Sequence, residues 1–228
     1  MKLNKVVVGL TLMLVPVAAS AGTLRAAMNS VGAYVEGQGV SSVQGGPDVG
    51  LGIRGGATLG NWFGTAGFHY DFGGYGSYGT SAPSGGYIWH MDVKAGYLVP
   101  LSTRIRVGPY FGYSHLQTHE DFNGILRTGA GMNAVGGGIY AAWAPMQRLS
   151  FQAYAGYLAG VSSSLSINGF PIPTQNTPNI VQVGVLADYR ISGPVHAFAA
   201  VRYDHIGHEA GAGGSQYRGL VGVSYSFG

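Results

Sequence analysis

Apolar and polar side chains alternate with a period of two along most of this chain. Residues 180–191 show the pattern clearly, because one face carries Val181, Val183, Val185, Ala187, Tyr189 and Ile191 and the other carries Gln182, Asp188 and Arg190. Such alternation is typical of β-strands with one face in apolar surroundings, and helical spacing of apolar residues is hard to find after Ala27. The chain is therefore predicted to be all-β.

Ten alternating segments can be distinguished. They are residues 31–40, 49–60, 62–72, 86–99, 103–117, 131–144, 148–161, 180–191, 195–206 and 216–227. They are 10–15 residues long, which is enough for a tilted strand to cross a bilayer, since that takes about 9–11 residues. After the first residues no uninterrupted apolar stretch comes near the ~18 residues that indicate a membrane-spanning helix.

The connections between these segments alternate between short and long. The short ones lie near Asn61 and at 100–102, 145–147 and 192–194, and the long ones at 41–48, 73–85, 118–130, 162–179 and 207–215. Bacterial barrels have short periplasmic turns and longer extracellular loops. We therefore predict a transmembrane antiparallel up-and-down β-barrel of ten strands, with eight strands as the alternative and the N-terminus on the periplasmic side.

The charged residues of the predicted strands oppose the apolar faces. The expected lumen charge network comprises Glu36, Arg54, Asp92, Lys94, Arg106, Asp188, Arg190, Arg202 and Asp204, and Asp71 and Arg218 lie on the same faces. A soluble β-sandwich or lipocalin-like barrel also alternates, but it needs many outward charges. Charged residues make up only 9% of this chain, against about 25% in an ordinary soluble domain. The membrane barrel is therefore favoured.

Aromatic residues gather near the predicted strand ends, as an interfacial girdle requires. On the periplasmic side we expect Trp62, Tyr97, Trp143, Tyr189, Tyr225 and Phe227, and on the outer side Trp89, Tyr203, Tyr113 and Tyr157.

The first residues resemble a secretory signal in all three of its parts. Lys2 and Lys5 supply the basic start, an apolar run covers 6–18, and small residues follow at 19–21. Cleavage after Ala21 would leave a signal peptide at 1–21 and a barrel domain at 22–228. The chain has no cysteine, so no disulfide framework supports the exported protein.

The charge balance argues against nucleic acid as a partner. Of the 12 Lys and Arg residues, two lie in the signal, so ten face nine Asp and Glu in the mature chain. No run of basic residues occurs. The electrostatic footprint of a nucleic-acid binder is missing.

The last segment, Tyr217 to Phe227, resembles the C-terminal strand of bacterial outer-membrane proteins, because it alternates and closes with an aromatic residue; here Gly228 follows. The mature chain resembles small barrels of the opacity-protein and surface-antigen type. The resemblance rests on this last segment, on Arg106 to Tyr113 (RVGPYFGY) and on the high content of glycine and tyrosine. The resemblance implies recognition by the barrel assembly machinery and a place in the outer membrane of a Gram-negative-type bacterium, among lipid and lipopolysaccharide. Relatives of this type often have eight strands.

Candidate chemistry is sparse, and no cofactor or metal is predicted. The nearest metal-ligand candidates are His115, His119, His205 and His208, where predicted loops begin. Asp204 beside His205 resembles the Asp and His pairs of omptin proteases, but the chain is much shorter than that family and only Glu120-Asp121 offers adjacent carboxylates at an outer strand end. Barrel-type lipid A deacylases use a Ser/His arrangement, but in this chain no Ser lies beside His205 or His208. We therefore expect no enzyme, with a barrel-mouth hydrolase as the distant alternative.

Two functional classes stay open. Ion pairs should plug the interior of a ten-stranded barrel, since aqueous channels appear at about 16 strands. This favours a structural or surface-interaction role through the outer loops. Inward-facing glycines that leave space favour a small passive channel instead: Gly50, Gly52, Gly108 and Gly112.

The loop at 162–179 is the best candidate for surface contact. It contains an Asn168-Gly169 pair between apolar residues, which is a strong hairpin signal. Ile167, Phe170 and Ile172 could then contact a surface ligand or fold over the barrel mouth.

Overall fold

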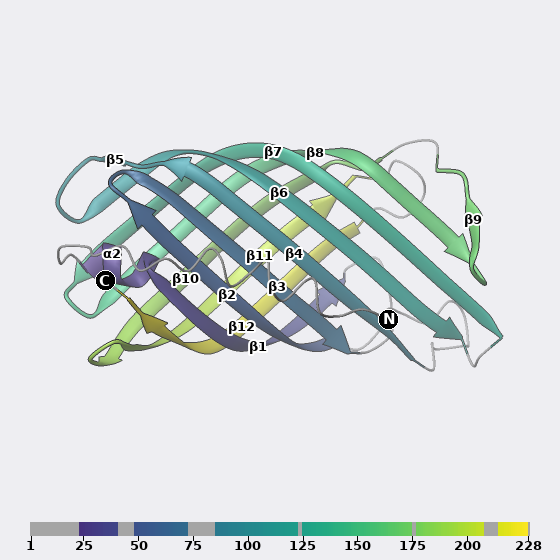
Figure 1. Ribbon diagram of the computed structural model, residues 1–228, viewed down its shortest axis with the longest axis horizontal. Coiled ribbons are helices and arrows are strands. Elements are labelled where there is room, and N and C mark those ends of the chain that lie inside the picture. Colours follow the sequence, from purple (N-terminus) through teal and green to yellow (C-terminus); the bar gives the residue numbers. More distant parts are fainter. Residues whose placement is uncertain are drawn as a thin grey trace.

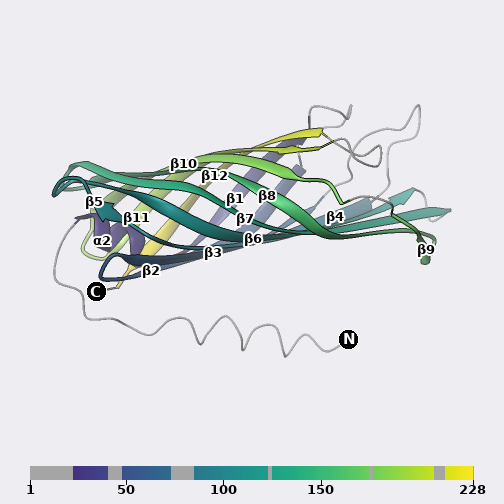
Figure 2. The same cartoon turned by 90° about the horizontal axis from the view of Figure 1, so that it is seen from above.

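Strand pairing in the computed structural model closes into an antiparallel β-barrel (Figures 1 and 2), described for residues 23–40, 48–72, 85–122, 125–174, 177–207 and 214–227. The elements are α2 (Thr23–Met28), β1 (Ser30–Val40), β2 (Asp48–Leu59), β3 (Trp62–Phe72), β4 (Gly85–Tyr97), β5 (Val99–Pro100), β6 (Ile105–Phe122), β7 (Leu126–Met146), β8 (Leu149–Ile167), β9 (Phe170–Ile172), β10 (Ile180–Ser192), β11 (Val195–Ile206) and β12 (Gly214–Ser226).

Ten of these strands form the ring, as the alternation predicts. The order around the ring is β10, β11, β12, β1, β2, β3, β4, β6, β7, β8, and pairing of β8 with β10 closes it. The first strand, β1, pairs along its whole length with the last, β12, from Ser30 with Ser226 to Val40 with Gln216. The short β5 and β9 pair with β6 and β8 respectively. The ten-strand prediction is confirmed, and the eight-strand alternative is wrong.

The two faces of the barrel have opposite chemistry. On β10, Val181, Val183 and Val185 are each more than 40% exposed, whereas Gln182 and Asp188 on the other face are at most 3% exposed. The outside is thus apolar and the inside polar, which is the reverse of a soluble barrel. This arrangement suits a lipid exterior, because closed strand pairing satisfies the backbone without water.

A short helix, α2, packs against the inward side chains at the end with the short turns. Its Leu24 and Met28 join a buried apolar cluster with Phe63, Leu98, Tyr110, Tyr140, Ala142 and Ala144. This helix was not predicted from the sequence, because six residues are too few to show a helical period. In the part of the chain that the structure describes, no helix is long and apolar enough to cross a membrane.

Residues 118–130, expected to form a loop, are mostly strand, so that prediction is wrong. β6 and β7 keep pairing from Thr118 with Ala130 as far as Asp121 with Arg127 and beyond. Here polar cross-strand contacts, such as Arg127 Nε to Asp121 Oδ2 at 3.0 Å, support the ladder. A strand that projects beyond the lipid does not need an apolar face. Residues 118–130 therefore lack the alternation of apolar and polar side chains from which strands are predicted. Figure 1 shows β6, β7 and β8 reaching well past the remaining strands.

The predicted Asn-Gly hairpin at 162–179 is confirmed. β8 continues to Ile167, and β9 turns back so that Leu165 pairs with Ile172. Asn168 and Gly169 adopt φ of 49° and 83°, the left-handed conformation that a tight hairpin turn requires. The hairpin extends the projecting part of the sheet.

Candidate functional site

The inward-facing charges of β4, β11 and β12 form one connected network. Arg202 Nη1 lies 2.8 Å from Asp92 Oδ1, and Arg202 Nε lies 2.7 Å from Asp204 Oδ2. Lys94 Nζ is 2.9 Å from Asp92, and Arg218 Nη2 is 2.8 Å from Asp204. Strands β4 and β11 are five steps apart in either direction around the ten-strand ring. The Arg202–Asp92 ion pair therefore spans the barrel interior.

Arg218 sets the protonation pattern of two buried histidines. Its Nη1 lies 3.0 Å from His69 Nε2 and 2.8 Å from His90 Nδ1. A guanidinium only donates hydrogen bonds, so both ring nitrogens are acceptors and both rings are neutral. His90 then carries its proton on Nε2 and donates it to Ser114 Oγ at 2.7 Å.

This histidine geometry has a chemical consequence for Ser114. A catalytic histidine must accept the serine proton, but here His90 donates to the hydroxyl. The pair therefore does not have the arrangement of a hydrolase dyad. Sequence reasoning missed it, because His90 and Ser114 are 24 residues apart and meet only through the pairing of β4 with β6.

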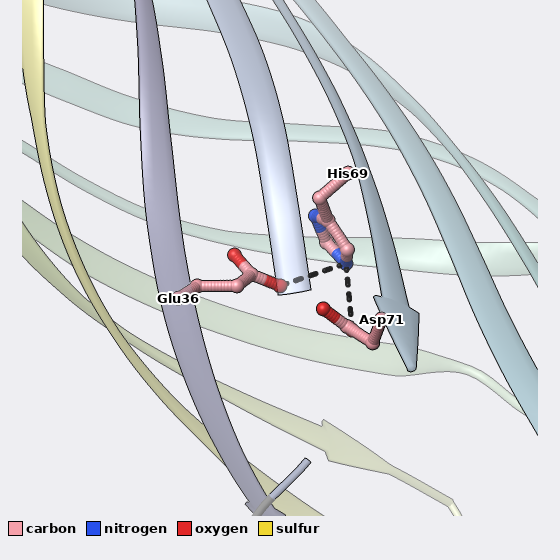
Figure 3. A group of neighbouring side chains, drawn as sticks. All are labelled: Glu36, His69 and Asp71. Atoms are coloured by element: carbon pink, nitrogen blue, oxygen red, sulfur yellow. Dashed lines mark ion pairs between the residues drawn. The ribbon is translucent and has the colours of Figure 1, made fainter. Parts of the chain in front are cut away.

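A second buried group lies toward the outer ends of β1 and β3 (Figure 3). His69 Nε2 is 3.3 Å from Glu36 Oε1 and 3.7 Å from Asp71 Oδ2. The pairing register aligns Glu36 with Gly50 of β2, and Gly50 with Asp71. The glycine between them lets the two carboxylates converge. The sequence pattern predicts inward positions for both carboxylates. It could also have predicted an inward position for His69, because His69 lies two residues before Asp71 on the same strand and so shares its face.

The other predicted network residues lie elsewhere in the interior. Arg54 sits over the Phe198 ring, 5.0 Å from its centroid. Asp188 Oδ1 contacts His196 Nδ1 at 2.5 Å. Arg106 and Arg190 lie toward the short-turn end, where Arg190 N donates to Arg148 O.

Inward glycines do not leave open space, so this expectation is wrong. A side chain at Gly50 would meet the Asp71 carboxylate, and one at Gly52 would meet the Tyr34 ring. One at Gly108 would meet the Tyr97 backbone, and one at Gly112 the Tyr110 ring. At Gly50, Gly52 and Gly108 the obstructing atoms belong to a neighbouring strand, whereas at Gly112 the ring comes from the same strand, β6.

A cavity of about 120 Å³ separates the charge network from the apolar cluster under α2. Its walls include Glu36, His69, Lys94, Tyr140, Tyr154 and Arg202. The volume has room for several waters, and the wall offers them polar partners. The interior thus has a cavity that can hold water between the charge network and the apolar cluster under α2.

Most of the predicted girdle aromatics lie on the outer surface. At the short-turn end, Trp62 and Tyr97 meet edge to face at 5.2 Å and Trp143 stacks on Phe151 at 5.5 Å. Tyr189 and Tyr225 are exposed, and Phe227 is half-buried. Toward the other end, Trp89 donates from Nε1 to Gln117, and Tyr203 packs against Tyr217.

The structure does not bring the loop-start histidines together as metal ligands. His115 Nδ1 contacts Asn133, His119 stacks on Tyr87, and His205 Nδ1 contacts Ser215. His208 lies outside the described residues. Within those residues, the group with metal-ligand spacing is Glu36, His69 and Asp71.

No protein-family model matches the chain, and the search of curated proteins found no match. Among solved structures, the outer membrane protease OmpT of Escherichia coli is similar over 87% of this chain and 94% of its own, with a TM-score of 0.58 and 11% identity. The translocator domain of the autotransporter NalP from Neisseria meningitidis covers 87% and 88%, with a TM-score of 0.46 and 13% identity. Ail, the attachment invasion locus protein of Yersinia pestis, covers 87% and 95%, with a TM-score of 0.41 and 10% identity.

At these identities the OmpT match shows the fold alone, and the other two TM-scores are too low to carry an argument. This chain has the fold of the outer-membrane β-barrels.

Proposed function

We propose that this protein resides in the outer membrane as a surface-interaction barrel of the opacity-like type, and that it acts through its outer hairpins. Residues 1–21 would serve as the cleaved signal, and the barrel assembly machinery would insert the mature chain among lipid and lipopolysaccharide. The observation that carries the proposal is the one-sided projection of β6, β7 and β8 beyond a closed interior.

The tips of the projecting hairpins carry exposed apolar side chains. Ile125 is 83% exposed and Phe170 is 75% exposed. Exposed large apolar residues held on a rigid support are a common feature of contact surfaces. Pro171 lies in the edge strand β9, where it resists addition of a further strand. A partner would therefore be contacted through side chains.

The two hairpins are tied together, which holds their tips in place. Arg127 N donates to Asn168 Oδ1 at 2.8 Å, and Asn168 N donates to Arg127 O at 2.7 Å. A surface ordered before binding loses less conformational entropy when a partner arrives. This rigidity supports recognition of a protein surface.

Closure of the interior argues against the two alternatives. A passive channel would require both the Arg202–Asp92 ion pair and the cluster under α2 to move aside. A serine hydrolase would require a histidine that accepts the proton of the nucleophilic hydroxyl. His90 instead donates a hydrogen bond to Ser114.

Two measurements test the proposal. The refolded protein should give no steady openings in planar bilayers, and steady openings altered by Arg202→Ala or Asp92→Ala would make it a channel instead. Bacteria that express it should adhere to immobilised extracellular-matrix protein, and the double substitution Ile125→Ser with Phe170→Ser should reduce adherence several-fold. Leu101→Ser is the matched control, because Leu101 is an exposed apolar residue at the opposite, short-turn end. Equal adherence of the double variant and the control would overturn the proposal.

A further inference from the structure

Asp71 is a buried carboxylate, and its side chain is 1% exposed. Its hydrogen-bonding side chain is the equally buried Glu36 carboxyl, so the two acidic groups share a proton and have no cationic donor among the described residues. Buried carboxylates are costly unless they are paired or bind a cation. The nearest guanidinium, that of Arg218, directs both terminal nitrogens at other groups: His69, His90, Asp204 and Gln216.

His69 does not supply the missing donor. Its Nε2 accepts from Arg218, so the atom that faces the two carboxylates bears a lone pair. A neutral imidazole nitrogen is the form that binds metal ions, and a metal ion would take the Nε2 lone pair that now accepts from Arg218 Nη1. Figure 3 shows the ring nitrogen and both carboxylates pointing toward one another. Three electron-rich atoms thus converge on one point.

We propose that Glu36, His69 and Asp71 bind a divalent transition-metal ion of the zinc class. The three ligand atoms lie within 4.8 Å of one another. Zinc bonds of about 2.0–2.1 Å in a tetrahedron place ligand atoms about 3.4 Å apart. The contacts of 3.3 and 3.7 Å from His69 Nε2 match that spacing.

The ligand types favour this class over calcium. Calcium takes 6–8 oxygen ligands, whereas this group offers two carboxylates and an imidazole. The two carboxylates balance the charge of the ion. Glu36 and His69 also line the interior cavity, which leaves room for water as a fourth ligand. Arg218 would lose one contact and keep His90, Asp204 and Gln216.

The ion would link β1 to β3 across Gly50 near the outer end of the barrel, and this site is independent of the surface proposal. The test is equilibrium dialysis of the tag-free, refolded full-length protein against zinc chloride, followed by elemental analysis. We expect one zinc per chain, with at least tenfold weaker binding in His69→Gln and Asp71→Asn. Excess calcium chloride should not compete.

Two matched controls should retain the zinc. Asp188→Asn removes a carboxylate from the other buried Asp–His pair, and His115→Gln with His119→Gln removes two half-buried imidazoles outside the group. The heat-dependent shift in gel mobility reports folding of every variant, and Glu36→Gln replaces Asp71→Asn if the latter does not fold. Absence of stoichiometric zinc in the unaltered protein, or zinc content unaffected by His69→Gln, would overturn the proposal.

Discussion

The carboxylate of Asp71 occupies the space that a side chain at Gly50 would need. Glycine at this position of β2 allows Glu36 from β1 and Asp71 from β3 to approach each other from the two flanking strands. The absence of a side chain on one strand therefore shapes the buried group on its neighbours.

Gly50→Ala should lower the stability of the barrel. The added methyl group meets both the Asp71 carboxylate and the Tyr70 carbonyl, so the backbone must shift as well as the side chain. Overpacking of this kind costs about 1–3 kcal/mol. The free energy of unfolding in urea, measured in lipid vesicles, checks this. Gly219→Ala is the control, because nothing lies within 4 Å of a side chain added there. Equal unfolding midpoints for the two variants would contradict the close packing described here.

Arg218→Met should destabilise the protein more strongly. The substitution removes the cation that contacts Asp204 and both buried histidines, and it leaves polar groups in the interior without their partner. Loss of one member of a buried ion pair costs about 3–5 kcal/mol. Arg127→Met removes the exposed pair with Asp121, for which about 0–1 kcal/mol is expected. If both variants unfold at the same urea concentration, the interior network contributes little to stability.

Asn168→Ala should loosen the tips of the projecting hairpins and leave the barrel intact. The substitution places alanine at a φ of 49° and removes the acceptor for Arg127 N. Both changes disfavour the turn by about 1–2 kcal/mol. Trypsin should cut after Arg127 faster, whereas the unfolding midpoint in urea should not change. Ser166→Ala, which loses only a long contact of 3.5 Å to Gly129 O, should be cut at the original rate.

The sequence by itself determined the class of fold, the number of strands and which face of each strand turns inward. The bounds of β3 and β11 agree with the expected 62–72 and 195–206 to the residue. The physical reason is that lipid on one side and a polar interior on the other impose a period of two on every spanning strand. That rule acts only within the membrane, so the paired residues 118–122 and 126–130 looked like loop. The signal at 1–21 lies outside the described residues and stays a prediction.

Only the tertiary structure decided which inward residues meet. Arg202 and Asp92 are 110 positions apart in the sequence, and Arg218 and His69 are 149 apart. Their contacts depend on strand order around the ring and on the pairing register, and neither is contained in the alternation of one strand. The same holds for the convergence of Glu36, His69 and Asp71 across Gly50. Sequence periodicity states which way a side chain points, and closure of the barrel determines what it meets.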